Sequence, residues 1–303
     1  MTSKYLLGAI KIVIFSIIAL ASTYVFLTLF NGQTLPFTFP ERKEPTIVLQ
    51  NIVLDDTIDS VDLEWYSGGV EITKSSDNKI HIVEKSSVQL DESKWVKPVV
   101  NGDTLVLHSR NKYNFVIFFL TNPDSYLELQ LPDQAYENFK TLVTSGNYSI
   151  SDFDINRFNL TMTSGNLHVN NMNSEDMNIT MTSGDSYFIQ VNTNTFDINM
   201  TSGNTSFTGS ISNELDIEMT SGNLDLDTSN DSPNQLNIEM TSGNANLTLS
   251  EDEGFQVAID KTSGNFNPDS KLTRLNDSLY QYLDYKLNYS VDMTSGSLSI
   301  NLR

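Results

Sequence analysis

Apolar and polar residues alternate with a period of two along most of the second half of the chain, and one short motif interrupts the alternation at regular intervals. The motif is Thr-Ser-Gly, followed in most cases by Asn. Successive motif glycines are separated by 19, 19, 19, 19, 21, 21 and 32 residues. A nearly constant period of this size predicts stacked structural repeats. The eight motif glycines are Gly146, Gly165, Gly184, Gly203, Gly222, Gly243, Gly264 and Gly296.

Aligning the repeats on this glycine brings the same kind of residue to the same offset. The positions seven, five and three residues before the glycine are apolar in most repeats, and so is the position four residues after it. In the repeat of Gly203 these positions hold Phe196, Ile198, Met200 and Phe207, and the residues between them are polar. Such alternation is typical of a half-buried strand. Each repeat is therefore predicted to contain a strand, a tight turn at the glycine, a second short strand and a polar return loop.

A repeat of this length cannot bury its own apolar face, whereas stacked repeats bury the aligned columns against one another. Every repeat runs in the same direction, so neighbouring coils must pair as parallel strands, about 4.8 Å apart. The sequence therefore predicts an all-β fold, a single-stranded parallel β-solenoid with coils of about 19 residues. The motif glycines are the expected structural turns, because glycine adopts a left-handed conformation without steric cost. A phosphate-binding loop would need clustered glycines and a basic residue before a helix, which the motif lacks.

The region before the regular repeats, residues 46–140, is rich in β-type sequence but has no fixed period. Ser60–Thr73 resembles a degenerate first coil with Gly68 in its turn. Asn101–Gly102 has the composition of a two-residue hairpin turn. The apolar run Asn114–Leu120 is too short to cross a membrane and predicts a buried strand. We expect this region to cap the first edge of the solenoid, which would otherwise be free to pair with another chain.

The regular repeats occupy residues 141–303 and include one insertion, at about 267–289, which accounts for the longest interval. The insertion is rich in Tyr and Leu, so we expect it either to cap the second end or to form a small contact surface. The repeat of Gly264 departs from the pattern, because Lys261 and Pro268 stand in apolar columns. This departure predicts a distorted coil.

The N-terminal residues predict a membrane anchor. Ile12–Phe30 is an uncharged, mostly apolar run, close to the roughly 20 residues that span a bilayer as a helix. The lysines that precede it favour a cytoplasmic N-terminus. We therefore expect residues 1–31 to form a cytoplasmic N-terminus and a transmembrane helix, and residues 32–45, with three prolines, to form a linker to an extracytoplasmic domain. A cleaved signal peptide ending at Ala19–Ala21 is the alternative, although the apolar run continues for nine residues beyond it.

The charge and the cysteine content of the chain argue against several classes of function. The formal net charge is −20 at pH 7, and residues 137–303 contain 7 Lys or Arg against 22 Asp or Glu. Such a surface repels phosphate backbones, so nucleic acid is not expected as a partner. The chain has no cysteine, which excludes a disulfide framework, a thiol nucleophile and a cysteine metal site.

Acidic residues on neighbouring coils could approach one another and form a candidate binding face. A glycosidase needs two carboxyl groups at a set separation in a cleft, whereas acidic residues on outward positions of a repeating face normally serve solubility. Calcium could bridge dense oxygen ligands, but no aspartate–glycine calcium loop repeats. The three histidines lack metal-ligand spacing, so no catalytic, cofactor-binding or metal-binding residue is predicted. The candidate acidic face consists of Asp216, Glu218, Asp225, Asp227 and Glu239.

Three segments carry a family likeness: the coil Ser67–Val70, the strand Leu127–Pro132 and the turn Thr144–Asn147 that follows it. With the later turns, they resemble the bacterial putative-adhesin family of membrane-associated, glycine-punctuated β-solenoid domains. The likeness covers most of the chain beyond residue 46. It implies an extracytoplasmic binding or scaffold role without established catalytic residues, and related domains occur in cell-envelope stress systems.

Two function hypotheses follow from these patterns. The first is a non-enzymatic, envelope-anchored module that binds an envelope protein, a peptide or a glycan. The second is a polysaccharide-active β-helix enzyme, either a hydrolase or a lyase. An even acidic ladder favours the first hypothesis, whereas acidic and aromatic residues clustered in one concave groove favour the second.

Overall fold

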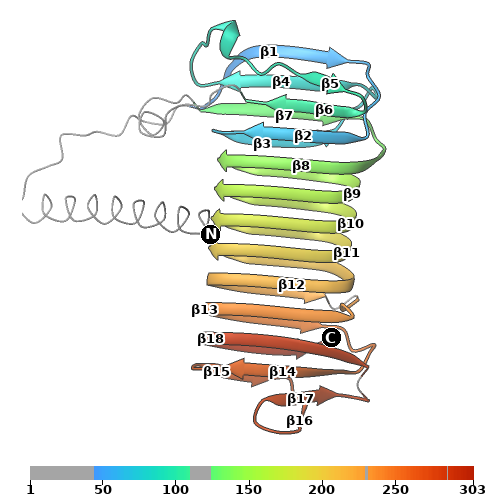
Figure 1. Ribbon diagram of the computed structural model, residues 1–303, viewed down its shortest axis with the longest axis vertical. Coiled ribbons are helices and arrows are strands. Elements are labelled where there is room, and N and C mark those ends of the chain that lie inside the picture. The colour runs from blue at the N-terminus through green and yellow to red at the C-terminus, as the bar shows by residue number, and fades with distance from the viewer. Residues whose placement is uncertain (1–43, 110–123, 229–230, 285) are drawn as a thin grey trace, which may run out of the picture. The chain divides into compact units, whose positions relative to one another are not determined.

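The computed structural model describes residues 44–109, 124–228, 231–284 and 286–303. The predicted anchor and the predicted strand at 114–120 lie outside these residues. Across the described ranges, no helix is long and apolar enough to span a bilayer. The described part is all-β, and most of its strands stack as successive coils (Figure 1).

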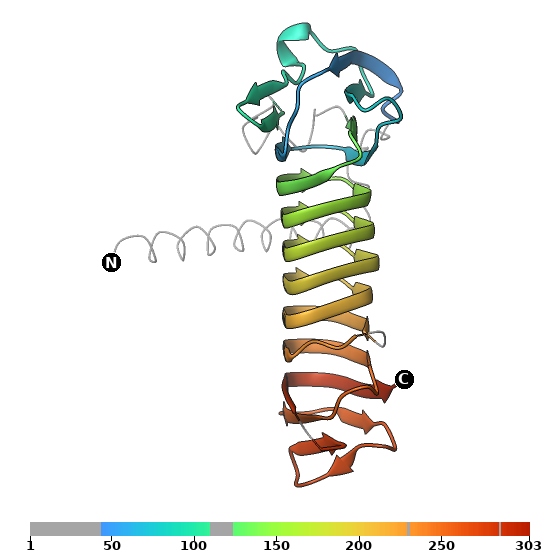
Figure 2. The same ribbon diagram turned by 90° about the vertical axis from the view of Figure 1, so that its right-hand side faces the viewer.

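The central coils are formed by five long strands that pair in parallel with their neighbours. Their register follows the repeat, so Ile179 lies opposite Ile198 and Met181 opposite Met200. The following pairs keep the motif positions aligned, with Met200 opposite Met219 and Met219 opposite Met240, although the register shifts locally between β11 and β12 near Val191. The resulting stack of narrow coils is clearest in the rotated view (Figure 2). The five strands are β9 (Tyr148–Ser164), β10 (Leu167–Ser183), β11 (Ser186–Ser202), β12 (Thr205–Thr228) and β13 (Gln235–Leu249).

Each motif glycine lies at the turn of its coil with a positive φ, between 106° and 138°. A Cβ atom on Gly203 would lie 1.7 Å from the carbonyl oxygen of Gly184 in the preceding coil. Glycine is therefore required both by the backbone conformation and by the close approach of the next coil. The residues after the glycines form a hydrogen-bonded ladder, in which Asn223 Nδ2 donates to Asn204 Oδ1 at 2.8 Å.

The core of the stack is built from the apolar columns. Phe196, Ile198 and Met200 are each no more than 1% exposed. The rings of Phe188 and Phe207 pack against Phe196, with centroids 4.9 and 5.2 Å from it. Burial of these columns along the whole stack is the main stabilising contribution.

The first coil, β2 and β3 with Gly68 at its turn, pairs in parallel with β8 and β9 on one side and with β6 and β7 on the other. Strands β1, β4 and β5 add antiparallel pairs at this end, and the pairing of Asn101 with Thr104 confirms the predicted hairpin turn. The elements are β1 (Ile47–Leu54), β2 (Ser60–Trp65), β3 (Gly69–Lys74), β4 (Ile80–Ser86), the short 3-10 helix Glu92–Lys94, β5 (Val99–Asn101), β6 (Thr104–His108), β7 (Ser125–Leu131) and β8 (Ala135–Ser145).

At the other end, the coils do not stack in sequence order. The last strand, β18, lies between β13 and the coil of β14 and β15, and it pairs with both in parallel. The insertion contributes β16 and β17, and β17 pairs antiparallel with β14. These elements are β14 (Phe255–Lys261), β15 (Asn265–Pro268), β16 (Thr273–Arg274), β17 (Leu279–Tyr282) and β18 (Leu287–Leu302).

The repeats were expected to stack in the order of the sequence. The properties of two residues, Lys261 and Pro268, explain why they do not. Lys261 and Pro268 are exposed in the coil of β14 and β15, which lies beyond β18. Proline cannot donate to a ladder and is found on edge strands, and a buried lysine would need a partner. The strand β18 carries Val291, Met293 and Ile300 in the same columns, and all three are buried. The coil of β18, which has apolar residues in these columns, therefore lies next to β13, and the coil of β14 and β15 lies beyond it.

Candidate functional site

The outward residues of the coils form two faces, separated by the glycine turn. We call the residues two, four, six and eight positions before each motif glycine the pre-turn face. We call those three and five positions after it the post-turn face. The register repeats along the stack, so each offset produces a column of side chains that runs from coil to coil.

The five acidic residues predicted from the sequence do not share one face. Asp216, Glu218 and Glu239 lie on the pre-turn face, whereas Asp225 and Asp227 follow the Gly222 turn and lie on the post-turn face. The expectation that all five approach one another is therefore corrected. The turn is responsible, because the chain reverses direction between its two sides.

The structure instead assembles an acidic column on the pre-turn face, at the offset of four residues before the glycine. Glu218 lies opposite Glu239, Glu239 opposite Asp292, and Asp292 opposite Asp260. Sequence reasoning missed Asp260 and Asp292, although both share the offset. Asn199 Nδ2 donates to Glu218 at 2.7 Å. Among the described residues, the carboxylates of Glu239, Asp260 and Asp292 have no hydrogen-bond or ion-pair partner.

A shallow hollow of about 270 Å³ runs beside this column, and we call it the acidic trough. Its floor is formed by the strands at Met200, Met219 and Met240, whose side chains are buried in the core. Carboxylates and threonine hydroxyls line the trough, so it offers hydrogen-bond acceptors that repeat from coil to coil. The polar residues that line it are Asn199, Glu218, Thr220, Glu239, Thr241, Asp292 and Thr294.

The electrostatics of this region are dominated by negative charge. No lysine or arginine lies between Arg157 and Lys261, whereas this stretch contains fifteen aspartates and glutamates. Burial, together with the charges of Asp216 and Glu214, raises the pKa of Asp197 above its ordinary value. The Nζ of Lys261 donates to the carbonyl of Gly264 at 2.9 Å. A cationic partner would therefore meet an attractive potential over several coils.

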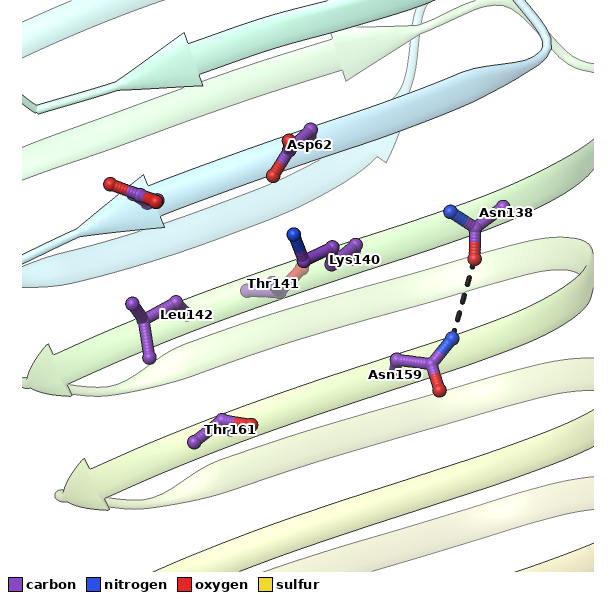
Figure 3. Close-up of a pocket in the computed structure, with 8 residues that line it drawn as sticks. Asp62, Asn138, Lys140, Thr141, Leu142, Asn159 and Thr161 are labelled. Carbon is purple, nitrogen blue, oxygen red and sulfur yellow. Dashed lines mark hydrogen bonds between the residues drawn. The ribbon is translucent and has the colours of Figure 1, made fainter. Parts of the chain in front are cut away.

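A second hollow, of about 390 Å³, lies on the pre-turn face near the first coil (Figure 3). Lys140 and Leu142 from β8 lie between Asp62 of β2 on one side and Asn159 of β9 on the other. Asn159 Nδ2 donates to the side chain of Asn138 at 3.3 Å. This hollow presents charges of both signs rather than a continuous acidic wall.

The histidines are dispersed over the fold. His108 Nε2 lies 3.5 Å from Asp62 Oδ1, and His81 Nε2 lies 2.6 Å from Asp77 Oδ1. Within the described ranges, no group of three or more His, Asp or Glu residues is arranged to hold a metal ion.

Among the described residues, the post-turn face carries small polar side chains, carboxylates such as Asp225 and Asp227, and an aromatic pair. The rings of His168 and Tyr187 lie on adjacent coils, with centroids 4.9 Å apart and an interplanar angle of 13°. Ile189, two residues beyond Tyr187 in the chain, is 50% exposed. Sequence reasoning missed this pair, although both residues stand three positions after their motif glycine.

Comparison with known proteins identifies the fold family. The family model described as Toastrack DUF4097 matches residues 58–302. No curated protein matches the sequence of the chain.

Solved structures that match the chain include proteins from Parabacteroides and Clostridium. A "putative lipid binding protein" from Parabacteroides distasonis is 12% identical with a TM-score of 0.50, over 86% of this chain and 99% of that one. A "putative cell adhesion protein" from Clostridium sporogenes is 14% identical with a TM-score of 0.31, over 84% and 99% of the two chains. A "putative adhesin" from Parabacteroides merdae is 9% identical with a TM-score of 0.35, over 86% and 98%. At these identities, the likeness to the first structure concerns the fold alone.

Proposed function

Because the chain belongs to the Toastrack DUF4097 family, we propose that it is a non-enzymatic binding module of the bacterial cell envelope. Its acidic trough would recognise a cationic partner such as a basic peptide or a basic segment of an envelope protein. The observation that carries the proposal is the acidic column from Glu218 to Asp260, in which three of four carboxylates have no partner among the described residues.

The geometry of the column supports binding rather than catalysis. Catalysis needs residues in distinct roles, such as a nucleophile beside a base, brought together at one point. The trough instead repeats one kind of lining, a carboxylate and a threonine two residues apart on the same strand, from coil to coil. A repeated surface suits extended recognition with many similar contacts.

Electrostatics supports a cationic ligand. Carboxylates on adjacent strands, about 4.8 Å apart, repel one another. A cation that enters the trough removes part of this repulsion and adds its own attraction to each carboxylate. Both contributions weaken as salt screens the charges, so the affinity should fall as ionic strength rises.

We also propose that residues 1–31 anchor the protein in a membrane and that the coils lie outside the cytoplasm. The support is the uncharged run Ile12–Phe30. Protease added to intact spheroplasts should degrade the coils if this topology holds. Protection in intact spheroplasts, with degradation only after lysis, would reverse it.

The binding proposal is tested with a lysine decapeptide and the full chain in detergent, by fluorescence anisotropy at low and high salt. The trough variant combines Glu218→Gln, Glu239→Gln and Asp292→Asn. The control variant removes three exposed carboxylates elsewhere, by Asp56→Asn, Glu175→Gln and Asp284→Asn. Both variants change the net charge equally, so only a local site distinguishes them.

We expect the trough variant to bind the peptide about tenfold or more weakly than the control variant, since several charge contacts are lost together. Equal weakening in the two variants would mean that only the overall charge matters and would refute the trough as a site. Turnover of an envelope polysaccharide by the purified protein, abolished by one trough substitution, would favour the enzyme instead.

A further inference from the structure

The post-turn face contains a place where an aromatic ring, a small residue and a carboxylate follow one another along the stack. Tyr187 lies opposite Ser206 on the next coil. The ladder from Asn204 to Asn223 carries the same register to the following coil, so Ser206 is followed by Asp225. Ser206 thus separates an aromatic ring on one side from a carboxylate on the other.

The orientation of the Tyr187 ring follows from its stacking on His168. Their centroids are 4.9 Å apart and their planes are 13° from parallel, and this distance is close to the spacing of about 4.8 Å between adjacent strands. Rings in contact have planes about 3.5–4 Å apart, so a centroid distance of 4.9 Å shows that the two rings are offset and that their planes are inclined to the stack axis. One face of Tyr187 is covered by His168, and the other is directed toward the position of Ser206, whose side chain is short.

The carboxylate of Asp225 is partly free. Asn246 Nδ2, on the following coil, donates to Asp225 Oδ1 at 3.0 Å. Oδ2 accepts no hydrogen bond from a described residue. Asp225 is exposed and Ser206 is half-buried, so solvent and ligands reach the position between Asp225 and Tyr187.

We propose that Tyr187, Ser206 and Asp225 form an arginine-binding site, in which a guanidinium group of a basic peptide stacks on the Tyr187 ring above Ser206 and donates to Asp225. The ring and the carboxylate lie two coil steps apart, about 9.6 Å between their strands. A guanidinium that stacks on the inclined ring is inclined in the same way, so N–H groups in its plane can point along the stack toward Asp225 and form a charge-assisted hydrogen bond of about 2.8 Å. The site deepens the proposed function and rests on it for the class of partner.

The arrangement favours arginine over lysine. Guanidinium is planar, stacks on aromatic faces and presents a fork of donors, whereas the ammonium group of lysine is a compact and strongly hydrated charge. The exposed side chain of Ile189 lies beside Tyr187 on the post-turn face and can contact the aliphatic part of an arginine side chain. The acidic trough has no aromatic side chain in its lining, so we expect it to discriminate less between the two cations.

The test uses two peptides of equal charge, five Arg-Gly repeats and five Lys-Gly repeats, titrated against the full chain in detergent. Ser206→Tyr fills the position above the Tyr187 ring without changing any charge. Asp225→Asn removes the carboxylate, and Tyr187→Phe keeps the ring as a matched control. Circular dichroism and thermal midpoints verify that each variant is folded.

We expect the native chain to bind the arginine peptide about fivefold more tightly than the lysine peptide. Ser206→Tyr and Asp225→Asn should abolish this preference, and Tyr187→Phe should retain it. A preference unchanged by Ser206→Tyr would overturn the site while leaving the trough proposal intact. Failure of both peptides to bind the native chain would overturn the proposed function itself. Competition by a neutral oligosaccharide that depends on Tyr187 would assign the face to glycans and overturn the arginine site.

Discussion

Replacing a motif glycine with alanine should be far more damaging than replacing a turn glycine that has open space around it. Gly203 has φ +137°, and an added Cβ would lie 1.7 Å from the carbonyl oxygen and 2.7 Å from the carbonyl carbon of Gly184. Gly102 also has a positive φ, of +64°, but nothing lies within 4 Å of the Cβ position. Gly102→Ala is therefore a matched control for the backbone conformation alone.

The two magnitudes follow from these geometries. At Gly102, alanine meets only the left-handed conformation, which costs about 1–2 kcal/mol. At Gly203, φ lies outside the left-handed region that other residues reach, and the obstacle is backbone rather than a flexible side chain. The two coils must separate and weaken their ladder of hydrogen bonds, so we expect a loss above about 4 kcal/mol. For a domain of this size the corresponding fall in Tm is about 10 °C or more for Gly203→Ala and about 2–8 °C for Gly102→Ala.

Urea unfolding followed by circular dichroism gives both losses, with the midpoint and the slope determined separately. If Gly203→Ala fails to fold while Gly102→Ala folds, the result also supports the expected difference between the two positions. A loss at Gly203 no larger than the loss at Gly102 would refute the close stacking of glycine on glycine.

Three further outcomes are expected. Met200→Lys buries a charge in the core column, where the native side chain contributes roughly 1.5–3 kcal/mol, so its Tm should fall clearly, whereas Asn199→Ser on the pre-turn face should leave Tm within a few degrees. Burial and two neighbouring carboxylates raise the pKa of Asp197, so the ionised Asp197 side chain destabilises the folded protein. This destabilisation is fully present above the raised pKa and is lost as the pH falls below it. The native Tm should accordingly gain more than that of Asp197→Asn between neutral pH and the ordinary carboxyl range, and an equal gain would contradict this account. Deleting residues 287–303 removes an inner coil and should unfold the C-terminal end, seen as rapid proteolysis there, whereas Lys261→Ala on the outer coil should not.

The coil, its register and the location of its turns could be predicted from the sequence because they depend on local patterns repeated many times. One alternating stretch such as 196–200 would not by itself define the register of its strand in the sheet. Repetition at a fixed offset from glycine removes the ambiguity, since a slip of one residue would place every apolar column on the outside. The in-register pairing of Met181 with Met200 follows from this constraint.

The candidate site was harder to predict because it depends on which side of the turn each residue lies and on contacts between distant segments. Asp225 and Asp227 are close in sequence to Glu218, yet the Gly222 turn sends them to the other face. The hollow beside Lys140 depends on Asp62, which is distant in sequence and reaches this face through the pairing of β2 with β8.

The order of the coils at the C-terminal end illustrates a general limit of repeat sequences. The repeat defines the register between any two coils but does not define which coils are neighbours, because every pair would match equally well. Which coils become neighbours depends on the residues that depart from the repeat pattern. If the coil of Gly264 stacked directly on β13, Lys261 would lie opposite Met240 and Pro268 opposite Leu247, within the interior. With β18 inserted, Met293 and Ile300 take those places.

This choice also shapes the proposed binding surface. The inserted strand brings Asp292 opposite Glu239 and moves Asp260 one coil further out. The acidic column therefore consists of four consecutive carboxylates whatever the order, but Asp292 rather than Asp260 lines the trough. Strand β18 pairs with β13 on one edge and with β14 on the other, so the backbone at Asp292 is held between two strands. Asp260, by contrast, stands on the outermost coil beside the insertion. The exceptions to the repeat, Lys261 and Pro268, thus place a well-supported carboxylate in the trough that we propose to bind cations.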